Sequence, residues 1–229
     1  MIVLKLKNQM LGHFAEVLHR GSVWIRCGLL CLTSLALSLP SAAQTIDLFP
    51  GNRLGEWTRV ALPPDPLGNI DQWHTDPATR EIICDGNGGR EWLRYNREFS
   101  NFTLHAEWRF TKLAGSPKYN SGIYFRNNAD GSVWNQAQVA FDGGYIFGVT
   151  YSVGQLQHYT RQADMKENRL KPAGEWNVYD LRCEGSKCTL AVNGVITSTS
   201  DSVWKKGYIG LQAEGYRIEF RNLTIQELP

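Results

Sequence analysis

Residues 102–110 read FTLHAEWRF, in which every second side chain, from Phe102 to Phe110, is apolar. The intervening Thr103, His105, Glu107 and Arg109 are polar. This period of two is typical of a β-strand with one buried face and one solvated face. The stretch therefore predicts a strand that covers an apolar core with one side of its sheet.

Shorter stretches of the same kind extend outward in both directions. They predict strands near residues 82–84, 92–95, 122–126, 136–142, 145–151, 178–183, 188–192, 195–197, 208–213 and 217–225. Turn residues separate them, and Asn193-Gly194 is a strong hairpin signal. No long amphipathic helix is expected. The pattern predicts an all-β fold, a two-sheet antiparallel jelly-roll sandwich.

The first 43 residues have the features of an export signal. Basic residues, among them Lys5 and Arg26, precede an apolar run at 27–39, and Pro-Ser-Ala-Ala at 40–43 supplies small residues for cleavage before Gln44. The run is short for a bilayer-spanning helix, although an N-terminal membrane anchor is the alternative. We expect a signal peptide at 1–43, one domain at 44–229, a periplasmic or secreted protein, and no stable membrane span after cleavage.

The charge balance argues against a nucleic-acid partner. Residues 1–43 hold four of the 24 Lys and Arg and one of the 22 Asp and Glu, so the remainder is close to neutral. Binding to nucleic acid needs a basic face that displaces counterions, and the sequence contains no Lys/Arg cluster.

The cysteines predict one disulfide and no metal site. Cys183 and Cys188 flank four turn-like residues, so a hairpin would place them directly opposite each other, and an oxidising compartment would join them. Cys84 lies in an apolar run and is expected to be a buried thiol. Metal-ligand spacing of the Cys-x-x-Cys type is absent from the sequence.

Several strings occur in the order found in a known bacterial family. They are residues 120–126 (NSGIYFR), 171–177 (KPAGEWN), 207–212 (GYIGLQ) and 220–222 (FRN). On these strings, residues 44–229 resemble the 3-keto-disaccharide hydrolase domain family. The resemblance implies a concanavalin A-like lectin/glucanase sandwich that is secreted and has a carbohydrate ligand.

The resemblance also implies a reaction. Its substrate is a glycoside whose C3 hydroxyl has been oxidised to a ketone, which acidifies the hydrogen on C2. A base removes that hydrogen, the C1 oxygen leaves from the enolate, and water adds to the resulting eneone. Such a site needs a base, a donor or cation for the enolate oxygen, and an acid for the leaving oxygen. No cofactor is expected.

Candidate residues follow from strand alternation and from the resemblance. Arg126 is the candidate for holding the carbonyl or enolate oxygen, because a guanidinium is always charged and forked. The acid–base candidates are Asp142, Glu214 and His158. The candidate substrate-binding residues are Glu107, Tyr124, Gln136, Gln138, Tyr151, Asn177 and Gln212. Those on strand faces would form a polar floor for a sugar if their strands are neighbours in one sheet.

Two positions depart from the family pattern and support a second hypothesis. Gln136 stands where family members usually carry Glu, and Glu214 stands where they tend to carry His. An exported enzyme that acts on 3-keto-glycosides is the first hypothesis. A non-catalytic, lectin-like sandwich that binds carbohydrate is the alternative, since this kind of fold hosts both functions.

Overall fold

The structure is a computed structural model that describes residues 44–115, 117–201 and 204–229. The expected signal peptide, residues 1–43, lies outside the described residues. Within them, the regular elements are fifteen β-strands and one short 3₁₀ helix, η1 (Gln162–Asp164). None of the helical structure in the described part of the chain is long and apolar enough to span a bilayer.

The strands form two antiparallel sheets, which confirms the predicted fold class. Sheet A contains, in spatial order, β13 (Val195–Asp201), β12 (Lys187–Val192), β11 (Asn177–Glu184), β6 (Phe102–Phe110), β15 (Ile218–Glu227), β4 (Glu81–Cys84) and β3 (Trp73–Asp76), with β1 (Thr45–Asp47) paired to β15. Sheet B contains, in spatial order, β10 (Gln155–Thr160), β9 (Ile146–Ser152), β8 (Trp134–Ala140), β7 (Asn120–Asn127), β14 (Gly207–Ala213), β5 (Glu91–Phe99) and β2 (Trp57–Ala61).

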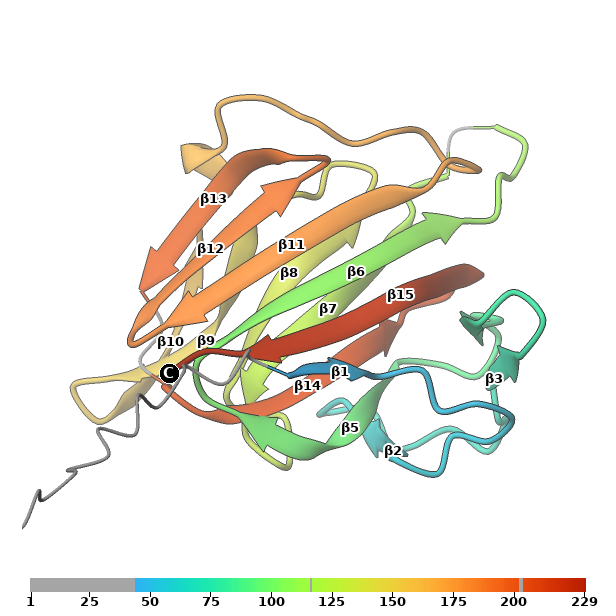
Figure 1. Ribbon diagram of the computed structural model, residues 1–229, viewed down its shortest axis with the longest axis horizontal. Helices are drawn as coiled ribbons and strands as arrows, with labels where there is room; N and C mark the ends of the chain where they lie inside the picture. The colour runs from blue at the N-terminus through green and yellow to red at the C-terminus, as the bar shows by residue number, and fades with distance from the viewer. Residues whose placement is uncertain (1–43, 116, 202–203) are drawn as a thin grey trace, which may run out of the picture. The chain divides into compact units, whose positions relative to one another are not determined.

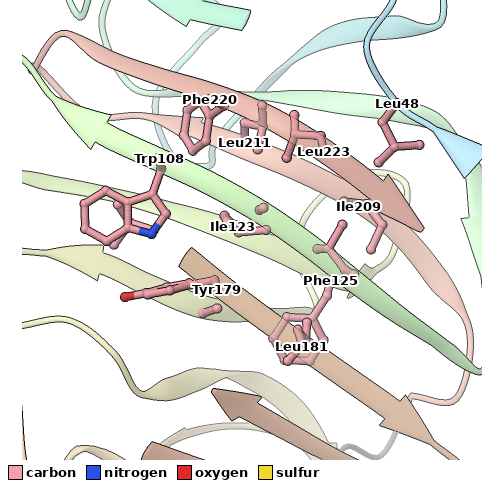
Figure 2. Close-up of a cluster of buried hydrophobic side chains, with 14 of the residues drawn as sticks. Leu48, Trp108, Ile123, Phe125, Tyr179, Leu181, Ile209, Leu211, Phe220 and Leu223 are labelled. Carbon is pink, nitrogen blue, oxygen red and sulfur yellow. The ribbon is translucent and has the colours of Figure 1, made fainter. Parts of the chain in front are cut away.

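The two sheets lie face to face, with the core between them (Figure 1). Burial in β6 follows the alternation seen in its sequence. Every second residue from Phe102 to Phe110 is buried. Apolar side chains from both sheets meet in this layer, among them Trp108 and Phe220 from sheet A and Ile123 and Leu211 from sheet B (Figure 2). Burying each such side chain stabilises the fold by roughly 1.5–3 kcal/mol.

One polar link crosses the core and ties the sheets together. The hydroxyl of Tyr179, on β11, donates a hydrogen bond of 2.6 Å to the backbone carbonyl of Gln138, on β8. Burial of Tyr179 is complete and raises the pKa of its hydroxyl, which therefore stays protonated as a donor. The bond holds the backbone of β8 at Gln138, whose side chain lies on the opposite face of the sheet.

Cys183 and Cys188 form a disulfide between the paired strands β11 and β12, as the sequence predicted. Cys84 is a buried free thiol. We expect the Cys183→Ser, Cys188→Ser double variant to lose about 2 kcal/mol of unfolding free energy, because the crosslink closes a short loop in the unfolded chain. Urea unfolding of both proteins measures the difference. Equal unfolding midpoints for the variant and the oxidised parent would contradict it.

Candidate functional site

A pocket of about 270 Å³ lies on the outer face of sheet B, opposite the core. Residues that alternate with its lining, such as Ile123, Ala137 and Leu211, are buried between the sheets. The pocket therefore lies over the middle of sheet B, and regular strands carry most of its side chains. The lining residues are Arg90, Asn120, Tyr124, Trp134, Gln136, Gln138, Tyr145, Phe147, Gln212 and Glu214.

Gly122 occupies the middle of the pocket floor. Its cross-strand partner on β8 is Gln138. On the other side, the pairing of Ile123 with Leu211 sets Gln212 of β14 beside it. A Cβ at position 122 would lie only 1.6 Å from Nε2 of Gln136. The side chain of Gln136 therefore lies across Gly122, in space that only a glycine leaves open.

The floor is a connected network of side-chain amides. Nε2 of Gln136 lies 2.7 Å from Oε1 of Gln212 and 3.1 Å from Oε1 of Gln138. Nε2 of Gln138 in turn donates to Oδ1 of Asn120 at 2.7 Å. An amide group offers two donors and two acceptor lone pairs, so these side chains retain capacity for the hydroxyl groups of a ligand.

We expect Gly122→Ala to lower ligand affinity by about tenfold or more, because the new methyl group displaces Gln136 from its partners. Titration calorimetry with a bound glycoside measures this effect. Gly55→Ala is the matched control, since a Cβ there meets no atom within 4 Å and Gly55 has no positive φ. Unchanged affinity in a folded Gly122→Ala protein would remove Gln136 from the binding surface.

Glu214 supplies a carboxylate at one end of the amide floor. It follows β14 two residues after Gln212, so both side chains lie on the outer face. Nε2 of Gln212 donates to Oε2 of Glu214, and Nε of Arg90 donates to Oε1 at 3.2 Å. Nη1 of Arg90 also contacts Oδ2 of Asp65 at 3.1 Å.

The surroundings of Glu214 suit it for proton transfer. Burial raises the pKa of the Glu214 carboxyl, Arg90 partly offsets this effect, and the charge of Asp65 raises the pKa further. A carboxylate with a raised pKa in a cleft is a candidate acid–base group, because its proton affinity moves toward that of the groups it must exchange protons with.

Aromatic rings form the other side of the pocket. Ring centroids are 5.9 Å apart between Tyr124 and Trp134, 5.1 Å between Trp134 and Phe147, and 5.8 Å between Tyr145 and Phe147. Burial raises the pKa of Tyr124, so its hydroxyl remains protonated. Polar groups on one side and ring faces on the other match a sugar, whose hydroxyls lie at its edges and whose C–H groups form apolar faces.

The structure brings together five of the residues expected from the sequence: Tyr124, Gln136, Gln138, Gln212 and Glu214 all line the pocket. Sequence reasoning missed five others, which are Arg90, Asn120, Trp134, Tyr145 and Phe147. For Asn120 and Trp134 the missing signal was strand length, whereas Tyr145 and Phe147 lie in the predicted strand 145–151 but were not among the candidates. Asn120 and Trp134 alternate in phase with Tyr124 and Gln136, but they precede the expected starts of those strands.

Arg126 does not reach this pocket, because the backbone of β7 breaks its alternation there. Arg126 has a φ of 51°. Tyr124 pairs with Gly210 and Asn127 pairs with Tyr208, so two residues of β7 oppose one of β14. This is a β-bulge, which re-aims the side chain that it carries. Arg126 therefore turns to the side of the core instead of the outer face.

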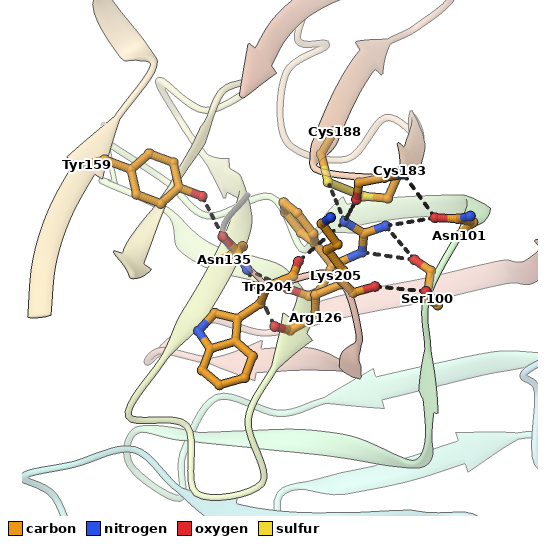
Figure 3. Close-up of a disulfide and its surroundings, with 11 residues drawn as sticks. Ser100, Asn101, Arg126, Asn135, Tyr159, Cys183, Cys188, Trp204 and Lys205 are labelled. Carbon is orange, nitrogen blue, oxygen red and sulfur yellow. Dashed lines mark hydrogen bonds between the residues drawn. A yellow bond between two sulfur atoms is a disulfide. The ribbon is translucent and has the colours of Figure 1, made fainter. Parts of the chain in front are cut away.

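The Arg126 side chain is fully buried beneath the disulfide (Figure 3). Its Nε donates to the carbonyl of Ser100 at 2.9 Å, and Nη1 donates to the carbonyls of Gly185 at 2.7 Å and Trp204 at 3.3 Å. Nη1 also lies 3.8 Å from Sγ of Cys188. Burial lowers the pKa of Arg126 to about 10, so it remains a cation at neutral pH. The structure gives Arg126 a structural role, in place of the catalytic role expected from the sequence.

Two expected binding residues lie elsewhere for topological reasons. Glu107 is on β6, which belongs to sheet A, and accepts hydrogen bonds of 2.8 Å from Arg221 and Asn222 on the outer face of that sheet. Asn177 is buried, and its Oδ1 accepts the backbone N–H of Lys171 at 2.8 Å. It anchors the segment before β11 and does not line the pocket.

The remaining three candidates lie outside the pocket lining. Asp142 follows the end of β8 and accepts a 3.4 Å hydrogen bond from Gln162. His158 and Tyr151 lie on β10 and β9, and both are exposed. Since His158 pairs with Val149, and Val149 with Trp134, His158 is on the same face of sheet B as the pocket.

A larger cavity of about 380 Å³ lies at one end of the sandwich, where Trp108, Phe110 and Tyr119 meet the segment around Leu170 and Pro172. Its lining contains no carboxylate or histidine. Chemistry is therefore better supported at the smaller pocket on sheet B. No cluster of three His, Cys, Asp or Glu residues suited to a metal ion occurs in the described parts of the chain.

Comparison with known proteins agrees with a carbohydrate site. A family model described as 3-keto-alpha-glucoside-1,2-lyase-like domain matches residues 44–226. The chain belongs to this family. The match confirms the resemblance seen in the sequence, since the 3-keto-alpha-glucoside-1,2-lyase-like family is the 3-keto-disaccharide hydrolase family under another description. A search of curated protein sequences found no match.

Solved structures show that this lyase-like domain shares its fold with carbohydrate-active proteins. Carbohydrate-binding module CBM66 from Bacillus subtilis is 17% identical, with a TM-score of 0.54 over 75% of this chain and 96% of the module. A Parabacteroides distasonis protein, provisionally assigned as a glycosyl hydrolase, is 15% identical, with a TM-score of 0.57 over 81% and 94%. Bacillus licheniformis β-glucanase is 10% identical, with a TM-score of 0.52 over 83% and 100%. At these identities, the likeness concerns the fold alone.

Proposed function

We propose that the protein is an exported enzyme that cleaves 3-keto-glycosides by elimination and hydration, at the pocket on sheet B. The observation that carries the proposal is the Glu214 carboxylate, held between Arg90 and Gln212 at the end of an amide floor. Membership of the 3-keto-alpha-glucoside-1,2-lyase-like family supports the substrate class. The fold supports a carbohydrate ligand but does not distinguish catalysis from binding.

Glu214 is the proposed base. Its carboxylate removes the proton from C2, and the electron pair of that C–H bond forms an enolate with the negative charge on the C3 oxygen. The enolate then re-forms the ketone, a double bond forms between C1 and C2, and the C1–oxygen bond breaks. The Glu214 carboxyl returns its proton to the departing oxygen. Addition of water across the double bond, with hydroxyl at C1 and hydrogen at C2, gives the free 3-keto sugar.

Arg90 is the proposed partner of the enolate oxygen, in the role first expected of Arg126. Its guanidinium lines the pocket, lies beside Glu214 and is partly exposed to solvent. A permanent cation at this position stabilises negative charge that develops on the C3 oxygen. The amides of Gln136, Gln138 and Gln212 bind hydroxyl groups of the same ring.

The proposal is tested by incubating the protein with a 3-keto-disaccharide and, separately, with the unoxidised parent sugar. We expect release of a monosaccharide from the oxidised compound only, because only the ketone acidifies the C2 hydrogen. Binding of both sugars without release from either would instead establish the lectin-like alternative. That alternative is favoured by one observation, the neutral amides that make up most of the floor.

Export is proposed on the features of residues 1–43. Cell fractionation followed by N-terminal sequencing tests it, with a mature chain that starts at Gln44 as the expected result. Recovery of the uncut chain in the membrane fraction would favour the N-terminal anchor.

A further inference from the structure

The pocket is small and lies on the open outer face of sheet B. Its volume of about 270 Å³ is at the lower end of the range of ~300–1,000 Å³ that is usual for sites enclosing a drug-sized ligand. A glycoside that places its oxidised ring against Glu214 therefore extends beyond the pocket. The group attached through the C1 oxygen, the aglycone, must lie on the neighbouring protein surface.

The two sides of the pocket differ in chemistry. Toward β5, Glu214, Arg90 and Asp65 form a charged chain. Toward β9, the lining consists of aromatic rings, with Trp134 and Phe147 in contact. A ring that carries a ketone and hydroxyl groups fits the charged side, which leaves the aromatic side for the aglycone.

Apolar side chains continue along β9 on the outer face of sheet B, where Val149 separates Phe147 from Tyr151. Phe147 and Tyr151 are four residues apart on β9, and this places their side chains on one face of the strand about 13 Å apart. Leu156 of β10 pairs directly with Tyr151 and lies on the same face. Tyr151 and Leu156 are 46% and 49% exposed. Large apolar side chains left exposed on the same face as a binding pocket offer a ligand-contact surface.

We infer that Tyr151 and Leu156 bind the aglycone, and that the preferred substrates are glycosides with a large, ring-containing apolar aglycone. The β9–β10 hairpin at the edge of sheet B carries both residues (Figure 1). The aglycone reaches them from the pocket by following β9 from Phe147 past Val149. This inference rests on the proposed function, because it assigns a binding surface to the aglycone of the proposed substrate.

The test compares two 3-keto-glucosides, one with a methyl and one with a biphenylmethyl aglycone. Both lose an alkoxide, so their intrinsic reactivities are similar. We expect kcat/KM to be at least tenfold higher for the biphenylmethyl compound. We expect Tyr151→Ala, Leu156→Ala to remove that advantage and to leave the methyl compound within twofold. Ile196→Ala is the matched control, as Ile196 is 67% exposed on β13 of the other sheet.

Equal kcat/KM for the two compounds, or an equal loss for both in the double variant, would overturn the inference. If the protein turns over neither compound, this result counts against the proposed function. The aglycone surface is then tested by a binding measurement. In that measurement, calorimetry with the unoxidised biphenylmethyl and methyl glucosides should give a Kd at least tenfold lower for the former. Equal Kd values there would overturn the inference independently.

Discussion

Glu214→Gln is expected to lower kcat/KM for a 3-keto-glycoside by about 10³-fold, within the range for loss of a positioned acid–base group. Glutamine keeps the size of the side chain and its hydrogen bond with Gln212, but it cannot take the C2 proton. Glu98→Gln is the matched control, because Glu98 is a partly exposed carboxylate paired with Lys206, outside the pocket lining. Steady-state kinetics on the two variants measure the difference.

The same carboxyl sets the expected pH dependence. The base must be ionised, so kcat/KM falls as pH decreases through the pKa of Glu214. Burial raises that pKa above the ordinary value of 4.5, so the acid limb should lie above 4.5 in the parent enzyme. The residual activity of Glu214→Gln should lack this limb. A Glu214→Gln enzyme within twofold of the parent would exclude Glu214 as the base.

Arg126→Ala is expected to cost about 3–5 kcal/mol of unfolding free energy, with little change in kcat/KM for the molecules that fold. The carbonyls of Ser100, Gly185 and Trp204 lose their donor, and each hydrogen bond to a charged group contributes about 1.5–3 kcal/mol. The loss also leaves space beneath the disulfide. Urea unfolding followed by tryptophan fluorescence measures the stability.

Arg53→Ala is the control for Arg126→Ala, because Arg53 is exposed in the connection between β1 and β2. We expect its unfolding free energy to stay within about 0.5 kcal/mol of the parent. A 100-fold loss of kcat/KM in Arg126→Ala at unchanged stability would support the catalytic role first expected of Arg126. It would also contradict the direction in which the structure places its side chain.

Local pattern was sufficient for the fold and for part of the site. The alternation in β6 describes its buried face, and the phase of Gln136, Ala137 and Gln138 correctly placed both amides opposite the core. These predictions succeed because side-chain direction in a regular strand depends only on a period of two. The hairpin that joins β11 to β12 was predictable for a similar reason, since its turn and its two cysteines are close in sequence.

The failures concern information that is not local. Glu107 and Gln136 both point away from the core, but strand order puts them on opposite outer surfaces of the sandwich. The prediction for Arg126 was wrong because a positive φ at this residue turns its side chain toward the core. The sequence carries no signal for a β-bulge that places a positive φ at a residue other than glycine. Arg90 lies one residue before β5, outside the stretches in which alternation was counted.

The Gln136 side chain that lies across Gly122 has a consequence for selectivity. Since Glu214 can only accept while ionised, it turns the NH₂ group of Gln212 toward itself, and the Gln212 oxygen then faces Gln136. The same constraint aims the NH₂ group of Gln136 at its neighbours and leaves its oxygen as an acceptor for the ligand. The backbone carbonyl of Ser121, 3.2 Å from Nε2 of Gln136, holds that NH₂ group in the same direction, so the charge of Glu214 and this carbonyl together set which hydroxyl donors and acceptors the floor recognises.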